Sequence, residues 1–69
     1  MSYYQFGKDI KQIQDYMIEK LDLYIEVETI NEMWTDFSNE EYSAGWIGVD
    51  KRILEEASKW FEKNKEDYL

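Results

Sequence analysis

The spacing of the apolar residues is the sequence feature that most constrains the fold of this chain. From Phe6 onward these residues recur every three or four positions, which is the period of an amphipathic α-helix. The first stripe consists of Phe6, Ile10, Ile13, Met17, Leu21 and Tyr24, with Ile18 and Ile25 beside it. Charged residues fall largely on the opposite side, so we predict a helix over about residues 7–22 with one buried face.

A second apolar stripe follows, but it points away from the first. It consists of Val27, Ile30, Trp34 and Phe37. One straight helix cannot bury both stripes in a single small core, so the chain is predicted to break between Asp22 and Glu28. Thr29 followed by Glu32 has the form of a capping box, which predicts that a new helix spans about residues 30–37.

A short third helix is predicted after this one. Ser38 and Glu41 form another capping-box pattern, so we expect a helix at about residues 39–46 that is ended by Gly45 and Gly48.

The clearest helix is the last one. Asp50 is a suitable N-cap residue, and apolar residues at helical spacing follow it over about residues 51–67. The stripe consists of Val49, Ile53, Leu54, Ala57, Trp60, Phe61 and Tyr68.

Strands are the alternative in the middle of the chain. Residues 22–28 alternate apolar and polar side chains, and residues 43–49 would suit a pairing partner, which indicates a two-stranded hairpin. We expect residues 1–69 to form a single compact all-α domain of three or four helices, and the alternative is an α+β domain with this hairpin. Because the chain is short and has no cysteine, its core depends on twelve aromatic residues, and homodimerisation would be one way to bury more apolar surface.

The net charge of −8 lies entirely in the middle of the chain. Residues 21–50 contain eight acids and no lysine or arginine, whereas acids and bases balance in residues 1–20 and 51–69. The eight acids are Asp22, Glu26, Glu28, Glu32, Asp36, Glu40, Glu41 and Asp50. Self-repulsion of this size opposes compaction, so the acids either serve a cationic partner or keep the protein in solution.

Composition argues against catalysis and metal binding. Histidine and cysteine are both absent, which removes the usual zinc ligands, the usual general base and the thiol nucleophile. The serines lie in no recognisable catalytic motif, and paired carboxylates would need a cleft that so small a domain barely encloses. Glu40 and Glu41 offer oxygen ligands, but the glycine and the closing glutamate of a calcium-binding loop are missing. We therefore expect no enzyme, no metal and no cofactor.

The sequence also predicts the surroundings in which the protein acts. The first residues lack the features of a signal peptide, and no apolar run approaches the ~20 residues that a membrane span needs. No patch of lysine and arginine stands clear of acids, so direct binding to nucleic acid or to an anionic membrane is disfavoured. We therefore expect a cytoplasmic protein that acts on another protein.

Three of the acids form a row if their segment is helical. Glu28, Glu32 and Asp36 then lie on one helix face, about 6 Å apart along the axis, at intervals comparable to those between successive backbone phosphates. The other acids that could take part in partner binding are Asp22, Glu26, Glu40, Glu41 and Asp50. Trp34 and Trp46 lie in the same region, and either of them would be an interface anchor if it stayed exposed rather than joining the core.

One short segment has a counterpart in a known family. The segment Tyr42-Ser-Ala-Gly45-Trp46-Ile47-Gly48 is similar to the Tyr-x-x-Gly-x-Leu-x-Gly-x-Trp segment of ArdA-type antirestriction proteins. Its second glycine comes one position early, and its tryptophan directly follows the first glycine. Together with the small size and the acidity, this segment resembles the phage and mobile-element proteins that inhibit host nucleases by imitating DNA, namely the antirestriction and anti-CRISPR proteins. The resemblance implies a class of mechanism and assigns no residue a role.

Two functions from different classes are therefore expected. In the first, a carboxylate-rich face occupies the basic DNA or RNA channel of a host defence nuclease or another nucleic-acid-binding protein. In the second, the chain is a helical interaction or regulatory module that docks through an apolar and aromatic face. Salt should weaken the first interaction steeply and the second very little.

Overall fold

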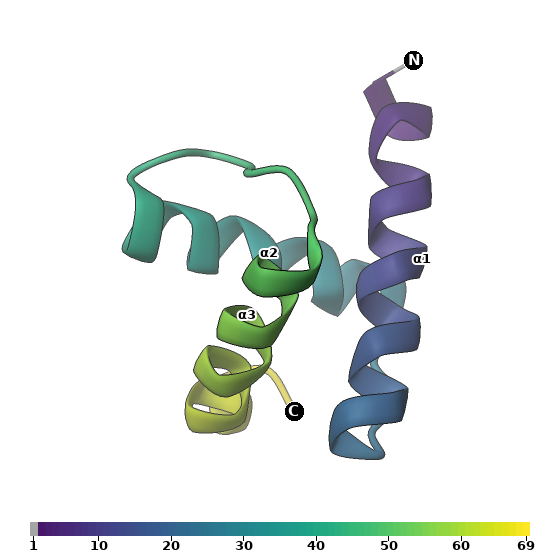
Figure 1. Cartoon of the computed structure of the whole chain (residues 1–69), viewed down its shortest axis with the longest axis vertical. Coiled ribbons are helices and arrows are strands. Elements are labelled where there is room, and N and C mark those ends of the chain that lie inside the picture. The colour runs from purple at the N-terminus through teal and green to yellow at the C-terminus, as the bar shows by residue number, and fades with distance from the viewer. Residues whose placement is uncertain (1) are drawn as a thin grey trace.

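The computed structural model describes the backbone of residues 2–69 and the side chains of residues 7–69. Three α-helices form, namely α1 (Ser2–Leu21), α2 (Val27–Tyr42) and α3 (Lys51–Asn64), and a 3₁₀ turn, η1 (Lys65–Asp67), follows α3. Figure 1 shows α2 lying across α1, and α3 packs against both. No strand occurs within residues 2–69, so the all-α prediction is confirmed and the hairpin alternative is wrong.

The predicted break between the first two helices is confirmed. α1 begins earlier than expected and ends at Leu21, after which Asp22 adopts a left-handed backbone conformation with φ 54°. From a buried position in α1, the side-chain amide of Gln14 donates a hydrogen bond of 2.8 Å to the carbonyl of Ile25. This bond fastens the connection between the helices to α1. The side chain of Phe6, predicted to join the apolar stripe, lies outside the described side chains.

A single helix, α2, replaces the two short helices that we predicted at about residues 30–37 and 39–46. Neither capping box forms, because Thr29 and Ser38 both lie inside the helix. The N-cap residue is Glu26, whose side chain makes no capping hydrogen bond.

The end of α2 is set by a serine rather than by a glycine. Ser43 has φ 54°, and its amide and that of Ala44 donate to carbonyls of the last helical turn. Gly45 and Gly48, which we expected to end the helix, have no positive φ. The helix therefore stops because of a left-handed residue that carries a side chain, which is a less favourable choice than glycine.

Two side chains of α2 hold the segment that leads to α3. The backbone amide of Ile47 donates to Ser38 Oγ at 3.2 Å, and the backbone carbonyl of Ile47 accepts from Trp34 Nε1 at 3.0 Å. Trp34 and Ser38 are four residues apart and therefore share one face of α2. The segment thus passes back along α2 without forming a strand (Figure 1).

α3 begins as predicted. Asp50 is its N-cap residue, and the Asp50 carboxylate accepts a hydrogen bond of 2.9 Å from the backbone amide of Ile53. The predicted helix over residues 51–67 is divided between α3 and η1.

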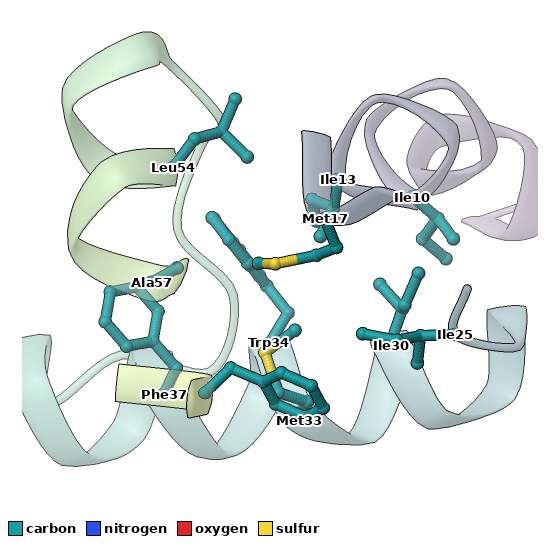
Figure 2. Close-up of a cluster of buried hydrophobic side chains, with 11 residues drawn as sticks. Ile10, Ile13, Met17, Ile25, Ile30, Met33, Trp34, Phe37, Leu54 and Ala57 are labelled. Atoms are coloured by element: carbon teal, nitrogen blue, oxygen red, sulfur yellow. The ribbon is translucent and has the colours of Figure 1, made fainter. Parts of the chain in front are cut away.

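All three helices and the connection between α1 and α2 contribute to one core. Its fully or nearly fully buried apolar residues are Ile10, Ile13, Met17, Ile25, Ile30, Met33, Trp34, Phe37, Leu54, Ala57 and Phe61. In Figure 2, Met17 of α1, Trp34 of α2 and Leu54 of α3 point toward one another. Tyr24 and Val27, which the stripes placed in the core, are 67% and 41% exposed, because the helical period is interrupted at the connection. Within the described residues, no helix combines the length and apolar character that a membrane span requires.

Candidate partner-binding face

Four carboxylates follow one another along the outer face of α2. The predicted row of Glu28, Glu32 and Asp36 lies on an unbroken helix, and because that helix continues, Glu40 extends the row by one more step of four residues. All four residues are exposed. With a rise of ~1.5 Å per residue, the steps are about 6 Å and the whole row is about 18 Å long. We call these four residues the acidic row.

No lysine or arginine neutralises the acidic row within the described side chains. The two ion pairs formed there are Lys11 with Asp15 at 3.2 Å and Lys65 with Glu62 at 3.6 Å. Both pairs are exposed and lie outside α2. Polar residues such as Thr29, Asn31 and Thr35 flank the row, so this side of the helix presents acceptors and uncompensated negative charge.

Two aromatic side chains hold the C-terminal half of the acidic row. The hydroxyl of Tyr68 donates to Asp36 Oδ2 at 2.6 Å, and the indole Nε1 of Trp60 donates to Glu40 Oε1 at 3.0 Å. The two rings contact each other with their centroids 6.2 Å apart. α3 and the residues that follow it therefore fix the orientation of carboxylates on α2.

The hydroxyl of Tyr68 is strongly biased toward its protonated form. Partial burial of the ring raises the pKa of Tyr68 well above its ordinary value, and the hydrogen bond to Asp36 and the negative charges of Asp36, Glu32 and Asp67 raise the pKa further. Tyr68 therefore remains a hydrogen-bond donor at neutral pH.

The other four acids predicted to bind a partner are all exposed, but they lie in different parts of the structure. Asp22 and Glu26 lie in the connection before α2 and extend the negative charge beyond the N-terminal end of the acidic row. Glu41 follows Glu40 directly and is therefore about 100° further round the helix, away from the row. Asp50 caps α3, so its carboxylate has a structural role in the fold.

The two tryptophans predicted as possible anchors lie in the core or pack against it. Trp34 has no exposed surface and belongs to the core, so its assignment to partner binding is wrong. Trp46 is half-buried and packs against the core, and its ring centroid lies 6.2 Å from that of Trp34.

We did not predict Trp60 and Tyr68 as neighbours of the acidic row. We predicted both as members of the apolar stripe of the last helix, and their rings do pack against the core. Their polar atoms, however, reach carboxylates that are 20 and 32 residues away in the chain. A donor on an otherwise apolar ring near the edge of a stripe is the one signal that pointed toward such a role.

Neither a metal centre nor a known relative explains this face. No group of three or more acidic side chains in the described residues is arranged to hold a metal ion. Comparisons with protein-family models, with curated proteins and with solved structures find no match. The geometry and charge of the acidic row are therefore the features that bear on function.

Proposed function

We propose that this protein inhibits a nucleic-acid-handling host enzyme, such as a defence nuclease, by placing the acidic row in the enzyme's basic DNA or RNA channel. The observation that carries the proposal is the series of four exposed carboxylates on one helix face, none of them paired with a lysine or an arginine among the described side chains. Their regular spacing of about 6 Å imitates a series of backbone phosphates. The protein acts as a binding protein and not as an enzyme.

Electrostatics favour this mode of binding. Negative charge extends along the acidic row and continues before the start of α2, where Asp22 and Glu26 are also exposed. A basic channel attracts such a surface from a distance, which accelerates association and makes it sensitive to ionic strength. Because the screening length is only ~8 Å at physiological salt, affinity should fall steeply as salt is added.

The test is affinity capture from host lysate at low salt, followed by a salt gradient and identification of the bound proteins. We expect a nuclease that is released by moderate salt and displaced by added duplex DNA. In the variant with Glu28→Gln, Glu32→Gln and Asp36→Asn, this capture should be lost. A control variant with Glu19→Gln, Glu55→Gln and Glu66→Gln changes the net charge equally at exposed positions outside the acidic row, and it should still capture the enzyme. Equal capture by the two variants would contradict the proposal.

Docking of a partner through an apolar surface is the second candidate function. An apolar hollow of about 220 Å³ lies where α1 meets the start of α2, and Ile10 and Val27 contribute to its lining. Tyr24, at 67% exposure, lies in the connection that leads to Val27. A partner that resists high salt and ignores added DNA would support this function instead.

A further inference from the structure

A groove lies between the C-terminal half of the acidic row and the end of the chain. Its volume is about 400 Å³, and Asp36, Glu40 and Asp67 contribute carboxylates to its lining. Trp60 and Tyr68 contribute aromatic rings. The groove therefore combines negative charge with flat apolar surfaces, whereas no aromatic ring among the described side chains lines the hollow beside Glu28 and Glu32.

Hydrogen bonds from Tyr68 and Trp60 orient the carboxylates of Asp36 and Glu40 in this groove. The rings of Tyr68 and Trp60 are themselves packed against the core. Trp60 packs its ring against Phe37 and Tyr68 packs against Phe61, each at a centroid distance of 5.8 Å, and both phenylalanines belong to the core. Each hydrogen bond to the acidic row engages one oxygen of a carboxylate and leaves the other for a partner. The carboxylates therefore lose little side-chain freedom when a partner binds.

We propose that Trp60 and Tyr68 are positioning residues of the partner-binding face, and that they orient Glu40 and Asp36 to receive an arginine side chain of the partner. A guanidinium group is planar, stacks on aromatic rings and donates several hydrogen bonds in a fixed arrangement. A lysine ammonium is compact and strongly hydrated, and it gains less from flat aromatic surfaces and from carboxylates that are already oriented. This inference rests on the proposed function, because it specifies the chemistry that the same face recognises.

Oligo-arginine and oligo-lysine peptides of equal length and with the same fluorescent label serve as probes. Their affinities for the whole protein are compared by fluorescence anisotropy at one fixed low salt concentration. The wild-type protein should bind oligo-arginine roughly threefold or more tightly than oligo-lysine. Equal affinities would overturn the inference, and this comparison needs no variant.

Two variants then identify the residues responsible. Tyr68→Phe and Trp60→Phe each remove a donor and keep an aromatic ring, and circular dichroism checks that both remain folded. Each should weaken oligo-arginine binding by roughly two- to tenfold, the range expected when one oriented side chain becomes mobile, and should change oligo-lysine binding much less. Glu28→Gln, at the far end of the acidic row, should weaken both peptides alike. An unchanged preference for arginine in both aromatic variants would also overturn the inference.

The outcomes separate this inference from the proposed function. If both peptides bind with equal affinity, and salt and the triple substitution in the acidic row weaken both, only the preference for arginine is wrong. If neither salt nor the triple substitution affects binding, the acidic row is not the binding face and the proposed function is wrong as well.

Discussion

Replacing Ser38 by alanine should lower the free energy of unfolding, whereas the same replacement at Ser58 should change it little. Ser38 is completely buried in α2, and its Oγ accepts the hydrogen bond from the backbone amide of Ile47. The backbone carbonyl of Ile47, in the next peptide group, accepts from Trp34 Nε1. Ser38→Ala removes one of these two attachments and leaves the amide of Ile47 without its acceptor.

The magnitude follows from the lost hydrogen bond and from helix propensity. The Ile47 amide lies in a partly buried place, and an amide that loses its partner away from water costs about 1–3 kcal/mol. Alanine returns up to about 0.5 kcal/mol, because it is a better helix former than serine. The free energy of unfolding should therefore fall by about 1–2 kcal/mol, which lowers the melting temperature of a domain of this size by roughly 5–15 °C.

Ser58→Ala is the matched control. Ser58 is also buried and helical, but its hydroxyl donates only to the carbonyl of Glu55 in the same helix, at 2.8 Å. This substitution should change the free energy of unfolding by no more than about 0.5 kcal/mol. Thermal and urea unfolding measure both effects, and hydrogen exchange at the Ile47 amide should accelerate only in Ser38→Ala. Equal destabilisation by the two substitutions, or unchanged exchange at Ile47, would refute the reasoning.

Three further predictions concern the end of α2, the tyrosine hydroxyl and the charge. Ser43→Gly should raise the free energy of unfolding by about 0.5–1 kcal/mol in urea titrations, because glycine adopts the left-handed conformation without strain. The raised pKa of Tyr68 stabilises the folded state fully below the unfolded pKa of about 10, and this contribution is lost as the pH rises beyond it. Wild-type stability should therefore fall more steeply than that of Tyr68→Phe above about pH 10 in urea titrations, and parallel curves would contradict this assignment. Raising salt from about 10 to about 150 mM should increase the melting temperature, because it shortens the screening length from ~30 to ~8 Å and weakens the repulsion within the acidic row.

Local sequence patterns correctly predicted the features of the helices that depend only on residues close together in the chain. Ile10, Ile13 and Met17 of the first stripe are buried as predicted, and Asp50 caps α3 as predicted, because both patterns depend on residues within a few turns of each other. The break before α2 was also predicted, because two stripes of different direction cannot occupy one straight helix.

The errors arose where a side chain had two uses that the sequence does not distinguish. A serine three residues before a glutamate can cap a helix, but Ser38 instead accepts from the distant amide of Ile47 and remains inside α2. Residues 43–49 have a composition that suits a strand, yet at Ile47 the side chains of Trp34 and Ser38 take the place of a strand partner. In each case a tertiary contact decided the local structure.

The acidic row could be predicted only in part, because local spacing places some of its residues and tertiary contacts place the rest. Helical spacing alone placed Glu28, Glu32 and Asp36 on one face, but Glu40 joined them only because α2 is continuous. The contacts of Trp60 and Tyr68 depend on how α3 packs against α2, and no spacing within the sequence specifies that arrangement.

α2 carries both the core and the proposed binding face, on opposite sides. Its inner side contributes Ile30, Met33, Trp34, Phe37 and Ser38 to the interior, whereas the acidic row occupies its outer side. Each pair of like charges four residues apart destabilises a helix by about 0.2–0.5 kcal/mol. The acidic row therefore weakens the same helix that contributes to the core. Replacing Glu28 and Glu32 by glutamine, which leaves the hydrogen bonds of Asp36 and Glu40 in place, should consequently leave the fold as stable as before or more stable, while the proposed binding is weakened. A row that only kept the protein in solution would show the same gain in stability without any loss of binding, and this difference separates a functional face from a solvated one.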